Sequence, residues 1–111
     1  MELQGPEEAL ASFDKAASLR PAAPEAWNYR GNVLKHLKRH DEALSSFNRT
    51  LALKSDFLKA FYFRAELFRD LGRHDEALLD AEAYEHLLFA RVHGYAPRPA
   101  KAPQFLREGR S

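Results

Sequence analysis

An internal repeat of 34 residues constrains this chain more than any other feature of its sequence. Ala9, Ala43 and Ala77 recur at that interval, and each follows two acidic residues and precedes a leucine. The whole segment Arg39–Leu44 is copied at Arg73–Leu78. Repeats of this length are units of supersecondary structure that bury their apolar faces by stacking on one another. The chain is therefore expected to be a stack of similar units.

Each complete unit predicts two helices. Pro24 and Glu25 suit the first turn of a helix, because proline has no amide hydrogen to leave unbonded and an acid complements the helix dipole. Apolar residues then follow at intervals of three and four, which places them on one face. A polar turn ends at His40, and Asp41 opens the second helix. The spacing predicts full units over residues 24–56 and 58–93, preceded by a half unit over residues 6–21.

Small and bulky residues alternate in a way that suits packed helix pairs. Helices that cross at about 8–10 Å leave no space for a large side chain at the crossing, and aromatic residues fill the gaps beside it. The structural repeat positions are Trp27, Gly31, Ala43, Phe47, Phe61, Ala65 and Ala77.

The order Trp27, Gly31, Leu34, Ala43 and Phe47 resembles the aromatic, glycine, large, alanine, aromatic pattern of the tetratricopeptide-repeat (TPR) family, in particular bacterial TPR arrays. The resemblance covers roughly residues 7–89. It implies an all-α fold, a right-handed α–α superhelical solenoid of about two and a half repeats. We expect this domain to span residues 1–94. The sequence departs from the family pattern at Thr50 and Ser55, which replace the usual alanine and proline.

Composition narrows the functional classes. The chain of 111 residues is long enough for one domain, and its net charge of +1 gives no strong field to attract nucleic acid or a membrane surface. It contains no cysteine, which excludes disulfides, thiolate catalysis and cysteine-based zinc sites. No secretory signal or membrane span is visible, so we expect a cytoplasmic protein.

The two ends of the repeat region differ from a capped solenoid. The half unit lacks its first helix, and Phe89 stands where the family has a proline, so the last helix is expected to continue to His93 and end at Gly94. Residues 95–111 form a basic, proline-rich tail that is either flexible or docked through Phe105 and Leu106. The uncovered apolar faces are explained either by a fragment of a longer array or by a homo-oligomer.

Candidate catalytic groups have structural explanations. His36 and His40 have a spacing that can hold a metal, but lysine and arginine neighbours disfavour a cation there. Asp41 and Glu42, with their copies in the next unit, suit helix starts. We therefore expect no enzyme activity, no metal and no cofactor.

The TPR resemblance implies that the first helices of the units line a concave groove that holds a peptide or helix of a protein partner. Amides there would bond to a peptide backbone, tyrosines would give amphipathic contact, and basic residues would meet an acidic partner. The expected groove residues are Asn28, Tyr29, Asn32, Lys35, Lys59, Tyr62, Glu66 and Arg69. Asn28 and Phe63 replace a lysine and an arginine of the family's carboxylate-binding co-chaperones, which disfavours that subtype.

Three functions remain open at this point. The first is a protein–protein interaction module whose groove binds a peptide segment of a partner. The second is the substrate-recruiting TPR segment of a larger enzyme, such as an O-linked glycosyltransferase. The third is a self-associating scaffold, a homodimer for example, that works through its uncapped ends.

Overall fold

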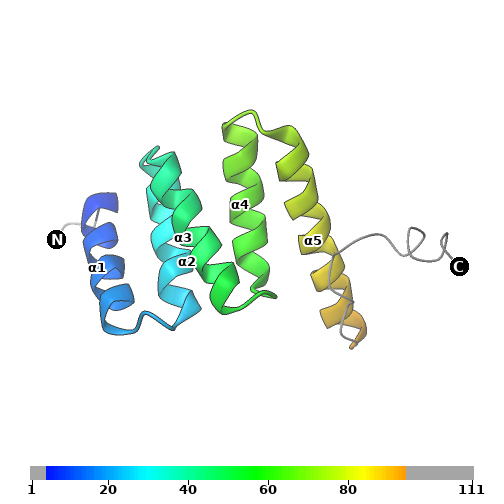
Figure 1. Ribbon diagram of the computed structural model, residues 1–111, viewed down its shortest axis with the longest axis horizontal. Helices are drawn as coiled ribbons and strands as arrows, with labels where there is room; N and C mark the ends of the chain where they lie inside the picture. The colour runs from blue at the N-terminus through cyan, green and yellow to red at the C-terminus, as the bar shows by residue number, and fades with distance from the viewer. Residues whose placement is uncertain (1–4, 95–111) are drawn as a thin grey trace, which may run out of the picture.

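The computed structural model describes residues 5–94 and contains five helices in that range, with no strand (Figure 1). They are α1 (Pro6–Leu19), α2 (Pro24–His36), α3 (His40–Leu53), α4 (Leu58–Asp70) and α5 (His74–His93). The predictions for residues 95–111 lie outside the described part.

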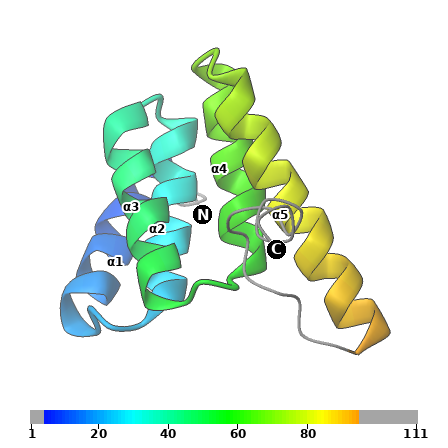
Figure 2. The same cartoon turned by 45° about the vertical axis from the view of Figure 1, so that its right-hand side comes forward.

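The helices form antiparallel hairpins that stand in a row (Figures 1 and 2). We name α2 and α3 the first hairpin and α4 and α5 the second hairpin. α1 lies against α2, and α4 lies against both helices of the first hairpin. The predicted class, an all-α helical solenoid, is confirmed.

Local sequence signals explain where the helices begin and end. Pro6 and Pro24 stand in the first turns of α1 and α2, and acidic pairs stand in the first turns of α3 and α5. Gly72 and Gly94 follow α4 and α5 with φ of 76° and 75°, a left-handed conformation that glycine adopts without steric cost.

The core joins the two hairpins and α1. Its cluster of buried side chains is Leu10, Leu34, Ala43, Phe47 and Leu67, which come from α1, α2, α3 and α4. Gly31 lies directly over the Phe47 ring. A Cβ atom built on Gly31 would stand 2.7 Å from Phe47 Cε1, closer than van der Waals contact allows. The sequence-based reason for a small residue at this helix crossing is therefore correct.

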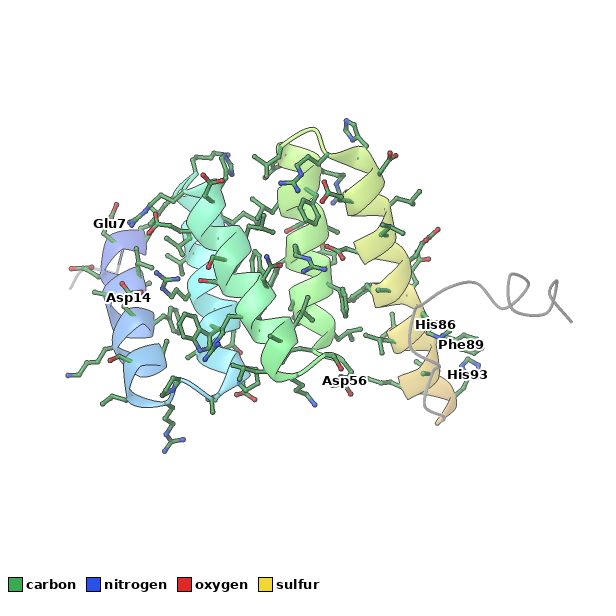
Figure 3. The ribbon with its side chains drawn as sticks, viewed as in Figure 1. Glu7, Asp14, Asp56, His86, Phe89 and His93 are labelled. Atoms are coloured by element: carbon green, nitrogen blue, oxygen red, sulfur yellow. The ribbon has the colours of Figure 1, made fainter. Side chains whose placement is uncertain are left out.

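Helix α5 is longer than the other helices, with 20 residues. Its last turns are held to the rest of the molecule by Ala90, which is buried, and by Arg91, whose Nη2 donates to the backbone oxygen of Asp56 at 3.2 Å. Asp56 lies in the loop between the hairpins, facing the end of α5 (Figure 3). None of the helices in residues 5–94 has the length and apolar character needed to cross a membrane.

Candidate protein-interaction surface

One arginine in each unit ties three helices together. Arg30 of α2 donates from Nε to Asp14 of α1 and from Nη1 to Ser46 of α3. Both partners lie 16 residues away, one before and one after the arginine. Asp14 lies on the side of α1 that faces the first hairpin (Figure 3).

The second unit repeats this arrangement. Arg64 Nη1 donates to Asn48 Oδ1 at 2.7 Å, while Nε and Nη2 donate to the two carboxylate oxygens of Asp80 at 2.7 and 2.8 Å. Asp80 is buried, and this two-bond contact supplies hydrogen-bond partners to both of its carboxylate oxygens. Sequence reasoning missed both arginines, although their 16-residue offsets recur with the 34-residue period.

One glutamate at the start of α3 and one at the start of α5 each accept hydrogen bonds from an arginine of the preceding turn. Arg39 donates from Nε and Nη2 to the carboxylate of Glu42, and Arg73 does the same to Glu76. These hydrogen bonds lower the pKa of both glutamates. The sequence assigned these carboxylates to the helix starts, where they lie, but Glu42 and Glu76 are bonded to arginine side chains and form no side-chain cap.

The two histidines considered for metal binding lie on different helices. His36 ends α2, and its Nδ1 lies 2.8 Å from the backbone oxygen of Asn32, whereas His40 begins α3. Within residues 5–94, no group of three or more histidine, aspartate or glutamate side chains could hold a metal ion.

The predicted groove residues of α2 and α4 meet at one ion pair. Lys35 Nζ lies 3.1 Å from Glu66 Oε1, and the Lys35 side chain is only 11% exposed. Lys35 was expected to face an acidic partner protein, but within the molecule it already faces an acidic side chain of the neighbouring repeat.

The expected exposure of Asn28 is wrong, because its side chain is completely buried. Its periodic position does place it on the side of α2 that would be open on an isolated hairpin, but α4 packs against α2 and the first hairpin is not isolated. Neither amide atom of Asn28 has a hydrogen-bond partner among the described residues, and the same holds for Oδ1 of the half-buried Asn32.

The two predicted tyrosines are exposed but lie beside different helices. Tyr29 packs on Phe13 of α1, with ring centroids 5.4 Å apart, so it lies at the α1 side of α2. Tyr62 packs on Tyr84 of α5 at 5.4 Å and is 45% exposed. Lys59 and Arg69 are exposed on the same helix as Tyr62. The exposed residues of the predicted groove are therefore concentrated on α4.

Comparisons with known proteins agree with this architecture. A family model described as tetratricopeptide repeat matches residues 1–57. A crystal structure of MamA superposes with a TM-score of 0.71 at 23% identity, over 74% of this chain and 48% of that one. A MamA mutant gives 0.70 at 30% identity, over 76% and 61%, and the AMB-1 form of MamA gives 0.70 at 27% identity, over 84% and 52%. The chain thus spans about half the length of these structures. Among curated proteins, none matches the sequence.

Proposed function

Because the chain belongs to the tetratricopeptide-repeat family, we propose that it is a protein-interaction module whose concave surface, formed by α2 and α4, binds a peptide segment of a partner protein. Both the family and the MamA-like structures support an interaction scaffold. Binding by this particular surface, without catalysis, is the proposal.

The proposal depends on the side chains that α2 and α4, which are in contact, present at the surface. Tyr62 and Lys59 are exposed on α4, and the side chain of Asn32 on α2 is half-buried. A peptide backbone offers both donors and acceptors, so it would pair with the part of the Asn32 amide that reaches the surface, while the tyrosine supplies contact area at low entropic cost.

The groove also selects by charge. The Lys35–Glu66 pair neutralises the middle of the surface, which leaves Lys59 and Arg69 as its exposed cations. We therefore propose that the bound segment is acidic near its ends and neutral at its centre. The absence of cysteine suits a reducing compartment such as the cytoplasm, where we place this function.

Peptide display against the full chain tests the proposal. Selected peptides, measured by fluorescence anisotropy, should bind the double variant Asn32→Ala with Lys59→Ala about tenfold or more weakly than the unaltered chain, because interface contacts of this kind each contribute on the order of 1 kcal/mol or more. Leu79→Ser is the matched control, since Leu79 is 64% exposed on α5 and should not affect binding. Equal affinities for the double variant and the unaltered chain would refute the groove.

A further inference from the structure

Besides the buried Leu67, three side-chain contacts hold α4 against the first hairpin. Each joins a side chain of α4 to one of α2 or α3: Glu66 pairs with Lys35, the Phe63 ring lies 6.2 Å from the Phe47 ring, and Arg64 donates to Asn48. Together they specify what a helix must carry to pack against a hairpin of this repeat.

The second hairpin presents the same positions with no helix of residues 5–94 over them. Arg69, Ala81 and Glu82 come 34 residues after Lys35, Phe47 and Asn48. We name the surface formed by Tyr62, Arg69, Leu78, Ala81 and Glu82 the terminal face. Beyond the second hairpin, no further helix of residues 5–94 follows (Figures 1 and 2).

Exposure shows how much of this face is uncovered. Tyr62 is 45% exposed, whereas Asn28 at the equivalent position of the first hairpin is 0% exposed. Leu78 is 58% exposed, whereas its equivalent Leu44 packs against the core cluster. Helix α4 packs against the first hairpin, whereas no helix of residues 5–94 packs against this side of the second, and this contributes to the difference in exposure.

The charges of the terminal face indicate what would cover it. Asp14, Asn48 and Glu82 are equivalent residues of successive second helices, and the first two each accept a hydrogen bond from an arginine of the helix that follows. Arg69 is the equivalent of Lys35, which pairs with a glutamate of the following helix. No ion pair joins Arg69 or Glu82 to another residue of the described range.

We infer that the terminal face binds a single amphipathic helix of a partner protein, placed as α4 is placed on the first hairpin. The bound helix would carry an aromatic residue, an arginine directly after it and a glutamate two residues later, the order found in Phe63–Glu66. The aromatic side chain would lie over Ala81, the arginine would meet Glu82 and the glutamate would meet Arg69. Because the two charges differ, their order fixes the direction of the bound helix.

This inference does not depend on the proposed groove. Leu78, Ala81 and Glu82 lie on α5, which contributes nothing to the groove, and only Arg69 and Tyr62 are common to both surfaces. Variants of Glu82 therefore test the terminal face, and variants of Asn32 with Lys59 test the groove.

The test uses the full chain and a fluorescent peptide of the α4 sequence Leu58–Asp70, held helical by a lactam bridge on its outer side. A second peptide exchanges the arginine and the glutamate of the motif. We expect the first peptide to bind at least about tenfold more tightly than the second, since opposed like charges at an interface disfavour binding strongly. The double variant Arg69→Glu with Glu82→Arg should reverse this preference.

Several results would overturn the inference. Equal binding of the two peptides would remove the charge pairing, and loss of peptide binding in Asn32→Ala with Lys59→Ala would place the peptide in the groove. A dimer by sedimentation that dissociates in Glu82→Arg would show that a second copy occupies the face. A tenfold gain in peptide affinity when the chain is shortened to end at Gly94 would show that residues 95–111 occupy the terminal face in the full chain. If only the display-selected groove peptides fail, the proposed function falls and this inference stands.

Discussion

Lys38 and Gly72 occupy equivalent turn positions, and both have the left-handed backbone conformation, with φ of 64° and 76°. A Cβ atom makes this conformation unfavourable by roughly 1 kcal/mol, and glycine avoids that cost. Lys38→Gly should therefore raise the free energy of unfolding by about 0.5–1 kcal/mol, measured by urea denaturation. Gly72→Lys is the reverse control and should lower it. Unchanged midpoints for both variants would contradict this account of the turns.

The arginine–glutamate pairs of the turns make the free energy of unfolding depend on pH in the acidic range. The pKa of Glu42 and of Glu76 is lower in the folded protein than the unfolded value of about 4.3, chiefly because an arginine donates hydrogen bonds to each carboxylate. The stabilisation is thus complete above that value and is lost as the pH falls through the folded pKa.

A variant with Glu42→Gln and Glu76→Gln should consequently lose less stability than the unaltered chain as the pH is lowered from about 5 to about 3. Urea midpoints across this range measure the effect. Parallel curves for the two proteins would show that other carboxyl groups account for acid unfolding.

At the residue scale, the sequence predicted correctly those contacts that form within a single repeat. Gly31 was assigned to a helix crossing because small residues, Gly31 and Ala65, recur there at the 34-residue period, and the structure places Gly31 against the Phe47 ring. Asn28 failed for the opposite reason. Its exposure depends on whether another hairpin packs beside its own, and periodicity within one helix does not contain that information.

At the scale of elements, Arg64 joins α4 to the second helices on both sides of it. Removing it would leave the buried Asp80 carboxylate without its partner. Arg64→Met should cost about 3–5 kcal/mol in stability, because an uncompensated buried charge is strongly unfavourable. Calorimetric melting measures the loss.

The companion variant distinguishes a lost charge pair from lost packing. Arg64→Met combined with Asp80→Leu replaces the pair by apolar groups, and it should recover most of the stability. If the double variant is as unstable as the single one, the contact between the helices depends on the shape of the arginine and not on the charge.

Helix ends were more predictable than helix partners. Gly94 was expected to end the last helix, and it does so in a left-handed conformation. The contacts of Arg30 and Arg64 could not be assigned beforehand, because residues 16 apart come together only once three helices have been placed. Recurrence of the arginine at the 34-residue period marks its position in the sequence, but its partners follow only from the fold.

For the whole molecule, Leu67 connects the second hairpin to the core of the first. Because Leu67 is completely buried, Leu67→Ala should lower the free energy of unfolding by about 2–5 kcal/mol. The same change should make the two hairpins unfold less cooperatively. Trp27 is the only tryptophan, so its fluorescence reports unfolding of the first hairpin. Circular dichroism reports the unfolding of all helices together.

We expect the two signals to follow one urea transition in the unaltered chain and to separate in Leu67→Ala. Leu79→Ala alters a leucine that is 64% exposed, and it should leave them together. Coincident transitions in the Leu67 variant would mean that the hairpins stay coupled by other contacts.

The arginine contacts have a consequence for how such a chain can change in length. Each arginine reaches 16 residues back and 16 forward, so one residue inserted between an arginine and either partner would break that spacing. Duplication of a complete 34-residue unit would keep every pair intact. A gene of this kind can therefore gain or lose whole repeats far more readily than single codons within its helices.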